Sequence, residues 1–254
     1  MYSVVTTRHS LRRNRLRDSE DEVYGIGFLR VKLSFSSDMS LIQNLHGTSH
    51  MIRTFLFDMG NVLTRFSHDT MCDQIGELCG LDGDSTRRLL IDSGLQWEFE
   101  RGRISEEVFR DQLSALVGRE IDLDQLRRAS SDIFDPIHEM KPIVQGLKEQ
   151  GYRLVLLSNT TISHFDWIKS KFDFLVPFDH CVVSYEAGAM KPDPPIYEAA
   201  LRAIHCEPGE AFYTDDIPEY VEKGREYGFQ AEVFTGPEDL LRHLAVRGVI
   251  PLRK

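Results

Sequence analysis

Four short segments of this sequence place reactive polar side chains directly after apolar runs. In chain order these side chains are Asp58, Ser158 with Asn159, Lys191, and the adjacent pair Asp215 and Asp216. A carboxylate can attack phosphorus, a lysine ammonium offsets the charge of phosphate oxygens, and a serine hydroxyl donates hydrogen bonds to them. A single aspartate after a strand usually caps a turn. The combination in this order predicts phosphoryl transfer.

The three carboxylates also predict a cation. Asp58, Asp215 and Asp216 would repel one another at one rim of a sheet and would raise one another's pKa. A Mg²⁺ ion removes that conflict, because it binds through one or two carboxylates, water and a substrate phosphate. The sequence therefore predicts a Mg²⁺ site.

Apolar runs of four to six residues alternate with helical segments along the chain. These runs and segments indicate the strands and helices that must bring the polar side chains together. The predicted strands are 52–57, 153–157, 180–184, 211–214 and 230–234, and the predicted helices are 142–150, 163–171, 194–205, 218–226 and 236–246. This alternation indicates an α/β fold, a doubly wound parallel (Rossmann-like) sheet with helices on both faces. Ligands bind beyond the carboxyl ends of such strands, which is where the polar side chains stand.

A helical block interrupts this pattern after the first strand. Residues 65–135 have helical periodicity and almost no strand-like runs, and Ser105 is placed to cap a helix that begins with Glu106 and Glu107. We therefore expect a Rossmann-like core of residues 51–64 and 136–254 with an inserted helical cap at 65–135.

The first fifty residues differ from the rest. They carry seven basic and five acidic side chains, a net charge of +2. Because the whole chain carries −10, residues 51–254 carry −12. We expect residues 1–50 to be a disordered extension or a wrongly assigned start, with Met51 as the initiator. An arginine-rich, acid-poor beginning is also compatible with an organellar presequence.

The acidic total argues against binding to nucleic acid or to anionic membranes, because a polyanion would be repelled. No apolar run has the roughly 18–20 residues that a membrane span requires. The four cysteines form no CxxC pair, which favours a reducing, cytoplasmic compartment over a zinc site or a disulfide framework. The sequence leaves the oligomeric state open.

The segments DMGNVLT, LLSNT, MKPDPPIY and YTDD resemble the four motifs of the haloacid dehalogenase-like hydrolase superfamily, with a helical cap inserted after the first strand. The resemblance covers about residues 52–250. It looks closest to the small sugar-phosphate phosphatases that read DxGNV at the first motif and carry a cap segment similar to residues 100–105.

The resemblance implies a Mg²⁺-dependent phosphatase of a small phosphorylated metabolite, such as a sugar phosphate, that forms an aspartyl-phosphate. Asp58 matches the nucleophile, and Ser158, Asn159 and Lys191 match the groups that bind the phosphate. The implied metal ligands are Asp58, the main-chain carbonyl of Gly60, Asp215 and Asp216, with Asp216 as the principal carboxylate.

Two positions depart from the usual pattern. Gly60 stands where most phosphatases of the superfamily have the aspartate that protonates the leaving group, and general acid catalysis is typically worth about 10²–10⁴-fold. His68 and Glu100 are the candidates for a substitute acid. Tyr220 stands where many relatives have Asn or Asp, which changes the surroundings of the metal.

Other reactions on the same scaffold remain alternatives. A dehalogenase needs no metal, so the acidic pair argues against it, and phosphonate cleavage stays open. A phosphomutase needs a proton shuttle, which Gly60 does not supply. A catalytically impaired domain with a binding or regulatory role is the alternative from another class, and Gly60 and Tyr220 are the residues that favour it.

Overall fold

The computed structural model describes residues 51–252, so the expectations for residues 1–50 lie outside the described residues. A five-stranded sheet has the order β5-β4-β1-β6-β7, and every neighbouring pair is parallel. The strands are β1 (Thr54–Phe57), β4 (Arg153–Ser158), β5 (His180–Val183), β6 (Ala211–Asp215) and β7 (Gln230–Val233). All five predicted strands are therefore confirmed, with ends that differ by one or two residues.

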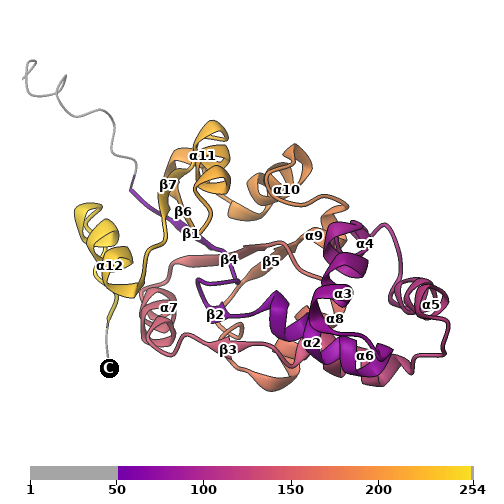
Figure 1. The fold of residues 1–254 in the computed structure, drawn as a ribbon. Helices are drawn as coiled ribbons and strands as arrows, with labels where there is room; N and C mark the ends of the chain where they lie inside the picture. Colours follow the sequence, from indigo (N-terminus) through magenta and orange to yellow (C-terminus); the bar gives the residue numbers. More distant parts are fainter. Residues whose placement is uncertain (1–50, 253–254) are drawn as a thin grey trace, which may run out of the picture. The chain divides into compact units, whose positions relative to one another are not determined.

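Side chains of the strands alternate between two buried layers. Phe55 and Phe57 of β1 pack into one apolar cluster, and Leu56 between them packs into the other. The helices that cover these layers are α7 (Met140–Glu149), α8 (Ile162–Lys171) and α12 (Pro237–Val246) on the first, and α10 (Pro194–Ile204) and α11 (Pro218–Glu226) on the second. Figure 1 shows the sheet between these helices. The doubly wound α/β fold is confirmed.

Some boundaries differ from the sequence-based prediction. Helix α7 begins at Met140 rather than at residue 142, because Pro142 fits within a first helical turn, where its missing N–H is not needed. The helix is followed by Gly151 with a φ of 86°, the left-handed conformation expected there. A short helix, α9 (Ser184–Ala187), and a 3₁₀ turn, η2 (Pro208–Glu210), were not predicted.

A helical insertion lies between β1 and β4. Its elements are α2 (His68–Cys79), α3 (Gly83–Arg87), the π-helical η1 (Arg88–Asp92), α4 (Leu95–Glu100), α5 (Glu106–Val117) and α6 (Leu123–Ser131). Ser105 caps α5 by accepting a hydrogen bond from the Val108 N–H at 3.3 Å, as predicted. The insertion has its own apolar cluster, which includes Met71, Leu90 and Leu113.

Two short strands close the base of the insertion. β2 (Thr64–Arg65) pairs antiparallel with β3 (Asp135–Pro136), so the chain leaves the core and returns to it at adjacent positions. Two-residue strands leave too short a pattern to be predicted from sequence.

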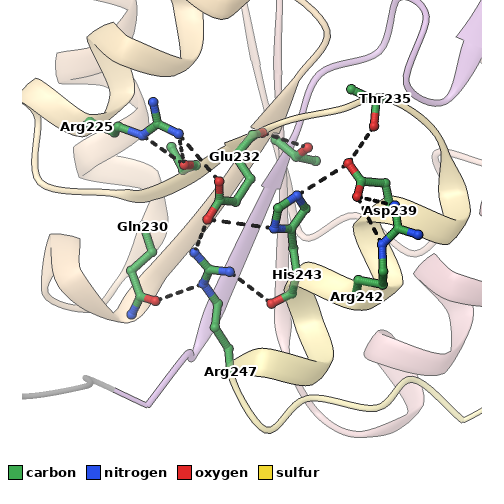
Figure 2. Close-up of polar contacts among 10 residues, drawn as sticks. Arg225, Gln230, Glu232, Thr235, Asp239, Arg242, His243 and Arg247 are labelled. Carbon is green, nitrogen blue, oxygen red and sulfur yellow. Dashed lines mark hydrogen bonds and ion pairs between the residues drawn. The ribbon is translucent and has the colours of Figure 1, made fainter. Parts of the chain in front are cut away.

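Helix α12 is fastened to the edge strand β7 by charged side chains (Figure 2). Glu232 of β7 accepts a hydrogen bond from Arg247 at 2.5 Å, and Arg225 of α11 lies 3.5 Å from the same carboxylate. Asp239 pairs with Arg242 at 2.6 Å within α12. These pairs are partly exposed, so each adds little stability. The contacts of Arg247 and of His243 (3.8 Å) with Glu232 are those that join the end of α12 to β7.

Among residues 51–252, no helix is both long and apolar enough to cross a membrane.

Candidate active site

Three neighbouring strands deliver the acidic residues to one point. β1 lies between β4 and β6, and the register continues past its end, since the Asp58 N–H donates to the Thr214 carbonyl at 3.0 Å. Asp58 directly follows β1, Asp215 ends β6, and Asp216 follows it. Ligand oxygens of these three carboxylates lie within 4.8 Å of one another.

Lys191 reaches this cluster from the segment before α10. Its Nζ donates to Asp58 Oδ1 at 2.7 Å, to Asp215 Oδ2 at 2.6 Å and to the Leu157 carbonyl at 3.0 Å. The lysine side chain is 1% exposed. All three donor positions of the ammonium are therefore used, and the cation is fixed between two carboxylates.

Asp215 and Asp216 have different surroundings. Asp215 is fully buried, and its carboxylate accepts from Lys191, from the Tyr213 hydroxyl at 2.6 Å and from the Ile217 N–H at 2.9 Å. Asp216 lines the adjoining cavity and accepts from Asn61 Nδ2 at 3.0 Å. Asp216 thus faces the cavity, and Asp215 holds Lys191 from beneath.

The two polar residues after β4 have separate positions. Asn159 forms a reciprocal pair with the backbone of Lys191: its Oδ1 accepts from the Lys191 N–H at 2.7 Å, and its Nδ2 donates to the Lys191 carbonyl at 3.1 Å. Ser158 is 1% exposed and its hydroxyl donates to the Asn159 carbonyl at 3.3 Å. Asn159 and the neighbouring Thr160 line the cavity, whereas Ser158 lies beneath it.

Burial and charge shift the protonation of this cluster. Burial raises the pKa of Asp58, Lys191 opposes that shift, and Asp215 adds to it. Burial also lowers the pKa of Lys191, but the carboxylates of Asp215 and Asp58 outweigh it, so this pKa lies above its ordinary value. The ammonium form of Lys191 is therefore maintained, whereas the pKa of Asp58 stays raised, to about 7, because burial outweighs the attraction of the lysine charge.

A cavity of about 210 Å³ lies over this cluster. Its floor contains Asp58, Gly60, Asn159, Lys191 and Asp216 from the core. Its other walls are mainly aromatic and come from the helical insertion and its connections; they include Phe66, His68, Trp97, Glu100 and Phe134. The floor is suited to a phosphate group and the walls to the part of a molecule that carries it.

An aromatic ring fills the space beside Gly60. A Cβ atom at this position would lie 2.7 Å from Phe66 Cε1, which is closer than carbon atoms approach. Phe66 in turn contacts the rings of His68 and Phe134 at centroid distances of 5.1 and 6.2 Å. The missing acid at position 60 is therefore accompanied by a cavity wall that occupies its place.

We expect Gly60→Asp to lower the free energy of unfolding by about 1–3 kcal/mol, because the new side chain overlaps the Phe66 ring. The double variant Gly60→Asp with Phe66→Ala should lose less free energy of unfolding than the sum of the losses in the two single variants. Urea unfolding of the four proteins measures this coupling. Strict additivity would show that Phe66 does not limit position 60.

Glu100, one of the candidates for a substitute acid, lines the cavity at the end of α4. The residue is 6% exposed, and its Oε1 accepts a hydrogen bond from Gln96 Nε2 at 3.1 Å. Burial raises the pKa of Glu100 to about 7, against smaller opposing effects of Gln96 and Arg101. At neutral pH this carboxyl is therefore protonated in a large fraction of molecules.

The cavity histidines are neutral. Burial lowers the pKa of His164 to about 4, and the neighbouring His68 adds to that shift. Burial and Arg87 lower the pKa of His68 as well. Of the two candidates for a substitute acid, Glu100 is therefore protonated in a large fraction of molecules near pH 7, whereas His68 is mainly in its neutral form and has no proton to donate as an imidazolium.

The pKa of Glu100 predicts a pH-dependent stability. The folded pKa of about 7 exceeds the unfolded value of 4.5, so the folded state loses stability as the pH rises from 4.5 through 7. At about 1.4 kcal/mol per pKa unit, Glu100→Gln should become more stable relative to the wild type by about 2–3 kcal/mol between pH 5 and pH 8. Urea unfolding of both proteins at each pH checks this, and parallel pH profiles would contradict it.

Tyr220 lines the cavity and does not take over the role of a carboxylate. Lys191 Nζ lies 5.2 Å from the centre of its ring, a cation–π contact. Sequence reasoning identified this position as a departure but did not predict the contact. It also missed Phe66, Tyr213 and Asn61, of which Asn61 had a signal, since it directly follows Gly60 in the DMGNV segment.

The chain has clear relatives. The family model described as haloacid dehalogenase-like hydrolase matches residues 52–228. The chain belongs to this family. A D-ribitol-5-phosphate phosphatase of Bacteroides thetaiotaomicron is 29% identical over 71% of this chain and 90% of the relative. A sesquiterpene phosphatase of Aspergillus oryzae is 27% identical over 65% of this chain and 81% of the relative.

Solved structures of the family have the same fold. A haloacid dehalogenase-like hydrolase from Porphyromonas gingivalis is 27% identical, covers 77% of this chain and 97% of its own, and has a TM-score of 0.66. An enzyme of B. thetaiotaomicron, solved with magnesium and inorganic phosphate, is 23% identical over 72% of this chain and 93% of its own, with a TM-score of 0.64. The family and enzyme class expected from the four motifs are confirmed: the chain is a haloacid dehalogenase-like phosphatase.

Proposed function

We propose that this chain is a Mg²⁺-dependent phosphatase that hydrolyses a small sugar or polyol phosphate through an aspartyl-phosphate at Asp58. The observation that carries the proposal is the convergence of Asp58, Lys191 and Asp216 at the floor of one cavity. The D-ribitol-5-phosphate phosphatase supports the substrate class.

The reaction proceeds in two displacements. A carboxylate oxygen of Asp58 attacks phosphorus, the bond from phosphorus to the leaving-group oxygen breaks, and an acyl-phosphate forms. The leaving-group oxygen takes a proton from water and departs as the alcohol. Water then hydrolyses the acyl-phosphate and regenerates Asp58. Lys191 is fixed beside Asp58 at 2.7 Å, where its charge stabilises the phosphate oxygens. Ser158 and Asn159 remain the groups that we expect to bind the phosphate with Lys191. Asn159 also sets the backbone position of Lys191, and the Ser158 hydroxyl donates to the Asn159 carbonyl at 3.3 Å.

The donor set fits magnesium. Asp58, Asp215 and Asp216 offer carboxylate oxygens grouped within 4.8 Å of one another, and carboxylate oxygens are ligands of the kind that magnesium takes. We assign Asp58, Asp216 and the Gly60 carbonyl to the cavity side of the site, with Asp215 as the third carboxylate. When bound, magnesium supplies positive charge against the phosphate and the acidic cluster.

The helical insertion serves as the cap in this proposal. Its residues Trp97 and Glu100 form walls of the cavity, opposite the core residues that hold phosphate. In this proposal these walls surround the leaving group.

Release of inorganic phosphate from a panel of esters tests the proposal. The panel contains D-ribitol 5-phosphate (the polyol phosphate), hexose 1- and 6-phosphates, an aryl phosphate and n-pentyl phosphate (the alkyl phosphate). We expect Mg²⁺-dependent release that EDTA abolishes, fastest with a sugar or polyol ester. A protein that binds Mg²⁺ but releases no phosphate from any ester would overturn the proposal, and activity indifferent to chelator would favour metal-free chemistry.

A further inference from the structure

The cavity that holds the reacting phosphate has one buried carboxyl group on its cap side, Glu100, within the described residues. The other carboxylates that line the cavity, Asp58 and Asp216, lie on the floor among the residues assigned to phosphate and metal. Glu100 comes from α4 of the insertion, so it faces the space left for the leaving group. Burying a carboxyl group without full hydrogen bonding costs free energy, so Glu100 is a candidate for a residue that binds part of the substrate.

The end of α4 is held firmly against the core. Gly102 has a φ of 66°, and a Cβ there would lie 2.1 Å from the Tyr185 carbonyl of α9, so the turn after the helix fits closely against the core. Arg101 Nε lies 3.8 Å from Asp193 Oδ2, before α10. Gln96 fixes one oxygen of Glu100 from the preceding helical turn. The carboxyl is therefore positioned by both parts of the protein.

The surroundings of Glu100 favour the neutral acid. The carbonyl end of α4 disfavours negative charge at its last residue, and burial has the same effect. The titratable groups that line the rest of the cavity are the neutral His68 and His164 and, on its floor, Lys191 with the carboxyl groups of Asp58 and Asp216. Arg101 is the cation adjacent to Glu100. A neutral carboxyl both donates and accepts hydrogen bonds, as a hydroxyl group requires of its partner.

The size and the other walls of the cavity limit the leaving group. About 210 Å³ is less than the roughly 300–1,000 Å³ of pockets for drug-sized ligands. The aromatic rings of Phe66, Trp97 and Phe134 suit the C–H faces of a short carbon chain or ring, and Glu100 is a hydrogen-bonding group between them.

We infer that Glu100 is a specificity-determining residue that hydrogen-bonds a hydroxyl of the leaving group, which selects phosphate esters of small polyols or sugars over esters of apolar alcohols. This inference rests on the proposed function and specifies its substrate class. An apolar leaving group would leave the Glu100 carboxyl buried without a ligand partner, which a site of this kind penalises.

The test compares the polyol phosphate with the alkyl phosphate, which has the same number of carbons and no free hydroxyl. We expect Glu100→Leu to lower kcat/KM for the polyol phosphate by about 10–100-fold more than for the alkyl phosphate. Glu100→Gln retains a donor and an acceptor and should keep part of the discrimination. Glu98→Gln on the same helix is the matched control, since Glu98 pairs with Arg103 in solvent, and should match the wild type.

Binding separates failure of this inference from failure of the proposed function. In the Asp58→Asn background, calorimetry with each ester should show the same selective loss on Glu100→Leu. Selective binding without turnover in the wild type would keep the inference and overturn the phosphatase proposal. Equal losses for both esters, no loss for either, or no binding of either ester would overturn the inference.

Discussion

Asp58→Asn is expected to lower kcat for phosphate release by about 10⁴–10⁶-fold, the size of effect seen when a covalent nucleophile is removed. The amide cannot form an acyl-phosphate, while its shape is nearly that of the carboxylate. The hydrogen bonds from Lys191 to Asp215 and to the Leu157 carbonyl remain available, so the site should keep its structure. Steady-state phosphate release with Mg²⁺, using the best ester of the panel, measures the loss.

The control for Asp58→Asn is Asp111→Asn, at a carboxylate that is 65% exposed on the helical insertion. It should have the turnover of the wild type. Binding of inorganic phosphate to Asp58→Asn, measured by calorimetry, should persist. Residual turnover within tenfold of the wild type would show that Asp58 is not the nucleophile, and loss of phosphate binding would place the residue in binding instead.

Lys191→Met has the largest expected effect on stability. The substitution leaves Asp58 and Asp215 buried together without the cation that lies 2.7 and 2.6 Å from them. Removing one partner from a buried ion pair typically costs about 3–5 kcal/mol, because the remaining charge is uncompensated. Globular domains have about 5–15 kcal/mol of stability in total, so this variant should be only marginally folded. Urea unfolding gives the difference.

Two comparisons identify the cause of that loss. Lys141→Met removes an exposed lysine that pairs with Asp173 at the surface and should cost less than about 1 kcal/mol. Adding Asp215→Asn to Lys191→Met should recover stability, because one of the two uncompensated charges disappears. The loss should also be smaller at pH 5 than at pH 8, since the carboxyls can then take up protons. A loss that is independent of pH and of Asp215 would indicate lost packing rather than charge.

The proposed specificity and the altered first motif concern the same cavity. Phe66 occupies the space of an acid at position 60, and Glu100 provides the protonated carboxyl on the cap side. In the proposed reaction the leaving group therefore departs without an acid at position 60. Gly60 changes which groups surround the leaving group and leaves the Asp58 and Lys191 pair intact.

The strands, most helices and the enzyme class were available from the sequence, because they depend on local patterns. The apolar run before Asp58 predicts a buried strand, and Ser105 predicts the start of a helix through a hydrogen bond three residues along the chain. The four motifs indicate phosphoryl transfer because each places one chemically suited side chain at the end of a strand. The three carboxylates at these strand ends indicate a cation, because they would otherwise repel one another.

Tertiary structure alone decided which of those side chains contact one another and which line the cavity. The order β5-β4-β1-β6-β7 places Asp58 between the ends of β4 and β6, and Lys191 meets Asp58 across 133 positions of sequence. Contacts of this kind depend on how strands assemble, and no local propensity encodes them. The same holds for Phe66 beside Gly60 and for Glu100 at the cavity, where the insertion folds back over the sheet. The sequence thus determined the reaction class, and the assembly of core and insertion decided which residues surround the leaving group.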